Sequence, residues 1–254
     1  MFLSRKVLAG VPVGPLEVEY IGGVSRSTSL TSGNTQNWGS TTIGTRAGQP
    51  GRKILLGLCF NYDNADGNNW PDADLTVTLG GETFGPADTT VLDRQAGYIV
   101  LSSGPTGDRE MIVFAEFGAT GFANSEALSI TAGARTIYYC HIFIIETLNV
   151  DWYSSAQDTD SSVSTDTFGT TNTLSNLETD FIVALFSNFH DSASFPSHSG
   201  TTLQSNVSLA NDSPNTWSHY GLGFNASPTA NLTVSQTPFS GSRSAQIVLV
   251  GQRS

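Results

Sequence analysis

The chain has 254 residues, of which 13% are charged and 38% hydrophobic, and its formal net charge is −11. This size suits one large or two ordinary domains, and the apolar content is enough for packed cores, which excludes global disorder. The only lysines are Lys6 and Lys53, so no basic stripe is available for nucleic-acid phosphates, and an anionic membrane surface would repel the chain. No apolar run is long enough to predict a transmembrane helix.

The N-terminus does not have the pattern of a signal peptide, because charged residues interrupt its apolar stretch and Pro12 and Pro15 follow soon after. We expect residues 1–15 to form a docking arm against another chain. A terminus is usually frayed unless something holds it, and this apolar, proline-bearing terminus needs such a partner. The expected contact residues of this arm are Arg5, Lys6, Val7, Leu8 and Val11.

Further along the chain, short runs rich in Val, Ile, Phe, Tyr and Thr alternate with clusters of Gly, Asn, Asp, Ser and Pro. No long window sustains helical periodicity, so the pattern predicts an all-β sandwich or barrel. The stretch 25–50 predicts a long loop or weak edge strands. The expected strands are 54–62, 74–79, 97–102, 110–117, 127–131 and 136–147, followed by 162–168, 180–189, 201–209, 216–225, 231–235 and 244–250.

The apolar pattern also predicts which strands are covered. Leu75, Val77 and Leu79 alternate with threonines, which indicates one buried and one wet face. Three other runs are almost entirely apolar, so they suit central strands covered on both faces or strands shared with a neighbouring module or subunit. These runs are 54–60, 137–145 and 181–186.

Five short blocks recur in the same order along the chain, which predicts a duplicated module. Residues 18–21 recur as 150–153, 54–58 as 181–185, 117–120 as 224–227, 128–131 as 232–235 and 133–136 as 241–244. This alignment places Leu58 opposite Leu185. We expect two tandem antiparallel β-sandwich modules, jelly-roll-like, at 16–148 and 149–254, joined directly near Leu148 and Asn149 because no Pro/Gly linker lies there. Duplication favours binding and assembly over catalysis.

The densest polar cluster is the loop 63–74. Its carboxylates could supply the oxygen ligands that Ca²⁺ prefers, although the spacing is not that of an EF-hand. A turn-rich loop that caps its own backbone is the simpler interpretation, in which case no cofactor is needed. Trp70 is the candidate for stacking on a glycan, and the alternative is that it folds back and caps the first sandwich. The candidate calcium ligands are Asp63, Asp66, Asp72 and Asp74.

Cys59 and Cys140 are the only cysteines. They are interpreted as two buried thiols that fill core space, with a disulfide between strands or a reactive thiol as alternatives. Arg135 and Arg243 lie at equivalent repeat positions, and they are expected to pair with a carboxylate or loop carbonyls, or to contact an interface.

The residue pattern predicts no enzyme. No Gly-x-Ser-x-Gly elbow is present, and no carboxylate pair stands out as a glycosidase would require. His219, between Trp217 and Tyr220, is expected to be half-buried on a strand. All four histidines lack a convincing zinc spacing and are interpreted as structural: His141, His190, His198 and His219.

The strand 180–186 is followed by a polar loop with Pro196, an aromatic strand at 217–220, a strand at 232–234 and a closing strand at 245–250. This order of strands and loops resembles that of the jelly-roll-type sandwiches in tailed-phage virion proteins of the tail-fibre, baseplate-appended and head-spike or decoration type. The resemblance implies a homo-oligomeric virion protein that binds other virion proteins and contacts host-surface glycans. The alternative is an extracellular carbohydrate-binding or carbohydrate-cleaving protein.

Overall fold

The structure is a computed structural model. It describes residues 14–63, 75–84, 91–93, 99–100, 108–118, 121–133, 136–160, 170–173, 176, 179–190, 197–210, 217–237 and 243–253. These residues form eighteen β-strands, which confirms the predicted all-β class. Among them, no helix has the length and apolar character needed to cross a membrane.

The first half of the chain forms two sheets, which we name the first inner sheet and the first outer sheet. The inner sheet has the order β1 (Glu17–Arg26), β10 (Ile137–Leu148), β3 (Arg52–Asp63), β8 (Asp108–Gly118) and β6 (Val91–Asp93), and β7 (Ile99–Val100) also pairs with β8. The outer sheet has the order β2 (Thr35–Thr42), β9 (Ser125–Ala132), β4 (Leu75–Leu79) and β5 (Glu82–Phe84).

The second half repeats this plan. Its inner sheet has the order β11 (Val150–Asp160), β18 (Arg243–Arg253), β13 (Phe181–His190), β16 (Trp217–Asn225) and β15 (Thr202–Ala210). Its outer sheet has the order β12 (Thr170–Thr173), β17 (Thr233–Thr237) and β14 (Ser197–Ser199). Every strand pair with a described register is antiparallel.

Both halves have the strand order of a jelly roll. If β6 and β7 are left out, the first half has eight strands, numbered here in chain order. Its inner sheet then has the order first, eighth, third and sixth, and its outer sheet has the order second, seventh, fourth and fifth. The second half has the same inner order through β11, β18, β13 and β16, and the same outer order through β12, β17 and β14. Strand β15 takes the place beside β16 that β6 and β7 take beside β8.

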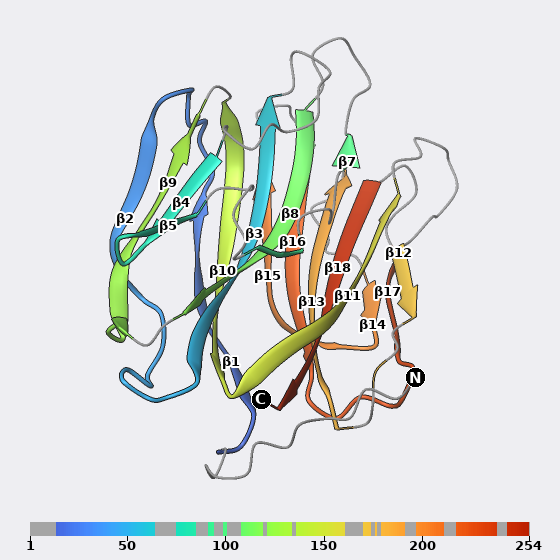
Figure 1. The fold of residues 1–254 in the computed structure, drawn as a ribbon. Coiled ribbons are helices and arrows are strands. Elements are labelled where there is room, and N and C mark those ends of the chain that lie inside the picture. Colours follow the sequence, from blue (N-terminus) through green and yellow to red (C-terminus); the bar gives the residue numbers. More distant parts are fainter. Residues whose placement is uncertain are drawn as a thin grey trace, which may run out of the picture.

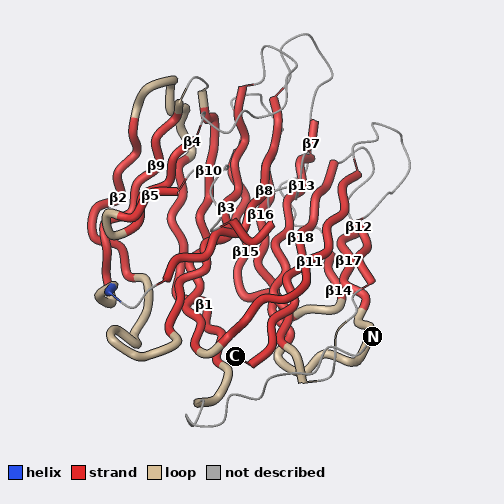
Figure 2. Tube along the Cα trace, viewed as in Figure 1, coloured by secondary structure: helices blue, strands red, loops and turns tan. Residues whose placement is uncertain are grey.

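The four sheets stack as layers: first outer, first inner, second inner and second outer (Figure 1). Figure 2 shows that strands make up most of the described chain, with loops at the ends of the layers. The two inner sheets therefore have both faces covered, and each outer sheet has one face covered. This arrangement explains why three strands of the inner sheets are almost continuously apolar, as the sequence predicted.

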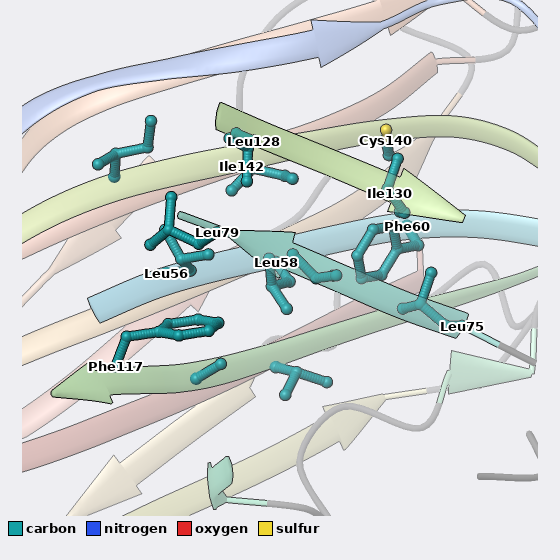
Figure 3. Packing of buried hydrophobic residues seen from close by; sticks show 14 of the residues in the cluster. Leu56, Leu58, Phe60, Leu75, Leu79, Phe117, Leu128, Ile130, Cys140 and Ile142 are labelled. Carbon is teal, nitrogen blue, oxygen red and sulfur yellow. The ribbon is translucent and has the colours of Figure 1, made fainter. Parts of the chain in front are cut away.

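The core of the first sandwich is filled by alternate residues of the inner strands and by the apolar face of the outer sheet. Leu56, Leu58 and Phe60 point from β3 towards Leu79 and Leu128 of the outer sheet (Figure 3). All five side chains are fully buried. The alternation of Leu75, Val77 and Leu79 with threonines in β4 places its apolar residues on this core, as expected.

A second apolar layer, which we name the intermodule core, lies between the two inner sheets. Its fully buried members include Leu55 and Phe143 from the first half and Leu185 and Leu222 from the second. Gly57 lies against the second inner sheet, because a Cβ there would come within 3.2 Å of Leu185 Cδ1. The halves are therefore joined as closely as two sheets of one sandwich, and a flexible linker is not needed.

One residue joins the two halves. Strand β10 ends at Leu148 and β11 begins at Val150. Between them Asn149 has a left-handed backbone with a φ of 56°, a conformation that asparagine tolerates better than most residues. Its side-chain amide donates to the carbonyl of Pro15 at 3.2 Å, and its N–H donates to Gly51 O at 3.0 Å. These bonds hold the chain where it crosses from one inner sheet to the other.

The strand registers give a more accurate alignment of the two halves than the sequence blocks. In β1 the register shifts between Tyr20 and Gly22, opposite Ile145 and Ile144, and in β11 it shifts between Trp152 and Ser154, opposite Gly251 and Val250. If these two shifts are equivalent, Ile144 of β10 corresponds to Val250 of β18. Ile144 pairs with Leu56 of β3 and Val250 pairs with Ile182 of β13, so Ile182 is equivalent to Leu56.

Leu185 is therefore equivalent to Cys59, and the sequence alignment with Leu58 is wrong by one residue. That error exchanges the two faces of the strand. Leu58 points into the first sandwich, whereas Leu185 points into the intermodule core.

Two further sequence interpretations change or become definite. The stretch 25–50, expected to be a loop or weak edge strands, contains β2, which is an edge strand of the first outer sheet. Cys59 and Cys140 are both buried and form no disulfide, because they lie on opposite faces of the first inner sheet. Burial raises the pKa of the Cys140 thiol to about 12, so it is not reactive at neutral pH.

Candidate functional site

The residues predicted from sequence to contact a ligand or a partner lie almost entirely outside the described residues. This is true of the stacking candidate Trp70, of the calcium candidates Asp66, Asp72 and Asp74, and of the docking residues Arg5, Lys6, Val7, Leu8 and Val11. Asp63 is the last residue of β3, and the position of its side chain is not described. These site assignments therefore stay predictions.

The described part of the chain contains no group of three or more His, Cys, Asp or Glu side chains that could hold a metal ion. The ion pairs of these described residues fall into two clusters within the fold. One holds the loop before β3, and the other lies where the two halves meet.

The first cluster is centred on Glu146 of β10, whose carboxylate is completely buried. Its Oε1 accepts hydrogen bonds from Arg52 Nε at 2.6 Å and from the backbone N–H of Arg46 at 3.1 Å. Its Oε2 accepts from Arg46 Nη1 at 2.6 Å and from the N–H of Thr45 at 3.0 Å. Gly44 has room for no side chain, since a Cβ would lie 2.1 Å from Glu146 Oε1.

Arginines connect this carboxylate to other segments. Arg52 Nη1 donates to the carbonyls of Phe122 and Ala123 at 2.9 and 3.1 Å, which ties the loop before β9 to the network. Arg46 also pairs with Glu17 and Glu19 of β1, at 2.6 and 2.7 Å. The cluster therefore joins β1, β3 and β10 to two loops.

The chemistry of Glu146 follows from these contacts. Burial alone would raise the pKa of its carboxyl, but the hydrogen bonds from Thr45, Arg52 and Arg46 outweigh burial, so the pKa is lowered. A carboxylate with four donors and no exposure cannot take a proton from a substrate. The network holds a loop in place, and the sequence signal for it was Arg52, two residues before the apolar run that begins at Ile54.

The second charged cluster lies at the edge of the intermodule core. Lys53 Nζ contacts Glu116 Oε1 at 3.1 Å and Asp151 Oδ1 at 3.6 Å, and it donates to the carbonyl of Val150 at 3.1 Å. Burial raises the pKa of Glu116, and the positive charge of Lys53 opposes that shift. Since Lys53 and Glu116 belong to the first inner sheet and Asp151 to β11, this cluster links the two halves.

The described histidines have structural surroundings. His141 is buried, its Nδ1 lies 2.7 Å from Ser25 Oγ, and its ring meets that of Phe143 edge-on at 4.2 Å. Burial lowers its pKa to about 4, so the ring is neutral at pH 7. His198 packs on the ring of Phe186 at 4.1 Å, and the side chain of His190 is not among those described.

His219 is fully buried, which corrects the expectation of a half-buried residue. Its Nδ1 lies 2.7 Å from Ser208 Oγ. It belongs to a row of neighbouring positions on β18, β13 and β16, which we name the polar row: Ser244, Asn188 and His219. All three residues are buried, and among the described residues neither the nitrogen nor the oxygen of the Asn188 amide has a hydrogen-bond partner.

Glutamines connect the two sheets of the second sandwich beside the polar row. Gln246 Nε2 donates to the carbonyl of Val234 at 3.0 Å, and Gln236 Nε2 donates to the carbonyl of Ser187 at 3.1 Å. Both glutamines are buried. The sequence analysis missed this polar end because its residues are scattered over four strands and only the fold brings them together.

The two arginines that the repeat singled out cannot be assigned contacts. Arg135 lies outside the described residues, and Arg243 begins β18 with its side chain not described. Arg46 and Arg52 have instead the structural role that was expected for that pair.

Comparison with known proteins adds little. No family model matches the sequence, and no curated protein matches it. Among solved structures, the chain is similar to a chain from the crystal structure of Cucumber Necrosis Virus, over 94% of this chain and 95% of that chain. The sequence identity is 10% and the TM-score 0.20, too low to carry an argument about shared fold or function. The jelly-roll architecture rests on the strand order alone.

Proposed function

We propose that this chain is a non-enzymatic structural component of a virus particle, specifically of a tailed phage, that docks by its N-terminal arm and displays two jelly-roll modules. The observation that carries the proposal is the intermodule core, which makes one rigid block of two modules. Domains that meet through small polar contacts move relative to each other, whereas a large apolar interface fixes them. A fixed orientation of repeated modules is useful in an assembly that stacks many copies.

The use of the charged residues supports the same proposal. Glu146, Arg52 and Lys53 make contacts within the fold, so these groups are not available to a substrate. The remaining support is the order of strands and loops in the sequence, which resembles that of tailed-phage virion proteins. In this proposal the chain is homo-oligomeric, its partners are other virion proteins, and its location is the virion.

The location can be tested with antibodies raised against the recombinant chain. We expect the chain to sediment with particles from the source culture in a density gradient and to be labelled on them by immunogold. Deletion of residues 2–15 should abolish incorporation while leaving the two modules of the soluble protein folded. A chain found only in the particle-free supernatant, or normal incorporation of the truncated chain, would count against this role.

Host contact is a finer part of the proposal. A surface with few lysines and many Asn, Ser and Thr side chains would hold a glycan by hydrogen bonds and stacking, and many copies on one particle would raise the overall affinity. Substitution of Trp70 by Ala should reduce adsorption to host cells with little change in melting temperature. If Trp70→Ala unfolds the protein instead, Trp70 is a core residue and not a stacking platform.

The competing function is an extracellular protein that binds or cleaves carbohydrate. A glycan array and a hydrolysis assay on host polysaccharide distinguish it from a virion component. Release of reducing sugar by the purified chain would contradict the non-enzymatic assignment, whereas glycan binding without release would leave it in place.

A further inference from the structure

One edge of the second inner sheet has the properties of an assembly surface. Strand β15 ends that sheet and, within the described part of the chain, pairs only with β16. Its outer edge therefore presents unpaired backbone N–H and C=O groups, which can template pairing with another strand. The strand spans Thr202–Ala210, and alternate residues from Thr202 to Ser208 are exposed.

The other long edge strands carry features that discourage such pairing. Strand β1 carries Glu17, Glu19 and Arg26, and β11 carries Asp151, Asp158 and Asp160. Strand β2 has no charge, but its register shifts in the middle, between Asn37 and Gly39. Charges and bulges are the usual means by which proteins protect sheet edges.

Strand β15 lacks both kinds of protection over most of its length. It contains no charged residue and no proline, and its only register shift lies near its start, between Leu203 and Ser205. Residues 205–210 therefore form a regular, neutral edge. In a chain with a net charge of −11, this edge is where two copies meet with the least repulsion.

We propose that β15 pairs antiparallel with β15 of a second copy, so that the two second inner sheets become one continuous sheet. A twofold contact brings the same segment together from both sides, so the segment must be compatible with itself. With the axis at Asn206, Ser205 lies opposite Val207 of the second copy, and Gln204 lies opposite Ser208. Each pair joins residues of the same face, and no pair joins like charges.

The apolar face of β15 explains why the partner is another copy of this chain. Val207 and Leu209 pack against the intermodule core from its edge, and Val207 is only half-buried. In the paired arrangement Val207 lies opposite Ser205 of the second copy and Leu209 lies opposite its Leu203, so the apolar layer continues across the contact. The contact would serve a soluble protein as well as a particle component, so it stands apart from the proposed virion role.

The test uses the full-length chain in sedimentation-equilibrium ultracentrifugation over a concentration series. We expect the unmodified chain to dimerise. Asn206→Asp keeps the size of an exposed side chain but places two negative charges opposite each other, which should raise the dissociation constant by about tenfold or more. Asn206→Lys should do the same. Ser40→Lys adds a charge to the exposed face of β2 and is the matched control that leaves the dimer intact.

An equimolar mixture of the Asn206→Asp and Asn206→Lys chains should restore the dimer, because opposite charges then face each other. Melting curves of each variant separate loss of pairing from loss of folding, and Asn206→Asp alone suffices if Asn206→Lys misfolds. An unmodified chain that stays monomeric over the whole series would overturn the proposal. A dimer that tolerates both substitutions at Asn206, or a mixture that stays monomeric, would also overturn it.

Discussion

The two jelly rolls share a strand order but fill equivalent positions with different chemistry. In the register set by the bulges of β1 and β11, Phe186 is equivalent to Phe60, Asn188 to Tyr62 and Gln246 to Cys140. One end of the first sandwich is therefore closed by aromatic and thiol groups, and the same end of the second by amides. Its sheets are joined there by hydrogen bonds from Gln246 and Gln236 across the layers.

At the opposite end the difference is reversed. Glu146 of the first half, buried and ionised, is equivalent to Gln252 of the second, which is neutral and only half-buried. The comparison indicates that alternation and strand order determine this fold, while individual interior positions accept apolar, amide or ionic groups if each finds suitable partners. It also identifies positions where a substitution has very different effects in the two halves.

The largest expected effect is the loss of the buried carboxylate. Glu146→Ala leaves the Arg52 guanidinium buried without its counter-ion, which should lower the free energy of unfolding by about 3–5 kcal/mol. The matched change in the other half, Gln252→Ala, should cost about 1 kcal/mol or less. Urea denaturation measures both values. Equal losses in the two variants would contradict the assigned difference between the halves.

The next effect concerns the layer that both halves share. Leu185→Ala opens a cavity opposite Gly57 and should lower the free energy of unfolding by about 2–5 kcal/mol. Because the intermodule core belongs to both sandwiches, calorimetry should still give one transition at a lower temperature. A split into two transitions would mean that the halves fold independently and that the shared core contributes little.

Acid should destabilise the protein through His141. Its pKa is about 4 in the folded protein and about 6.5 when unfolded, so between these values the unfolded chain binds more protons. The free energy of unfolding should fall as the pH is lowered through this window, by on the order of 3 kcal/mol in total from this group. The pH dependence of unfolding for His141→Gln should lack this part of the slope. An unchanged slope would show that His141 is protonated as readily in the folded state.

The smallest expected effect has the opposite sign. Asn188→Leu removes a buried amide that has no hydrogen-bond partner in the described part of the chain, so it should leave stability unchanged or raise it by about 1–2 kcal/mol. Gln246 lies at the same end of the second sandwich as Asn188. Gln246→Leu should instead destabilise the protein, because it leaves the carbonyl of Val234 without its hydrogen-bond donor. Thermal denaturation of the two variants compares them directly. A large loss in Asn188→Leu would indicate that the amide is satisfied in solution, for example by ordered water.

The sequence predicted the architecture better than it predicted which residues of the two halves are equivalent. Short strands, turn clusters and recurring blocks indicated an all-β chain with two similar halves, and the continuous apolar runs indicated strands covered on both faces. The same runs concealed the register, because a strand that is apolar on both faces has no alternation to show which residues point which way. For that reason the sequence blocks align Leu58 with Leu185, whereas the residue equivalent to Leu185 is Cys59.

The candidate sites divide in a similar way. Arg52 and Lys53 precede an apolar run, so the sequence carried a signal that buried partners were needed, but the partners Glu146 and Glu116 lie far away along the chain. The polar row has even less signal, since its three members come from three separate strands. The loop containing Trp70 and the N-terminal arm stay predictions from the sequence alone.

The sequence by itself determined the class of the fold and its duplication, since both follow from local periodicity and from blocks repeated in order. Only the tertiary structure decided that the two inner sheets pack face to face and that β15 is left as a neutral edge. The physical reason is that a pattern of apolar residues records how much of a strand is buried. It does not record which surface covers that strand, because any apolar face removes it from water equally well.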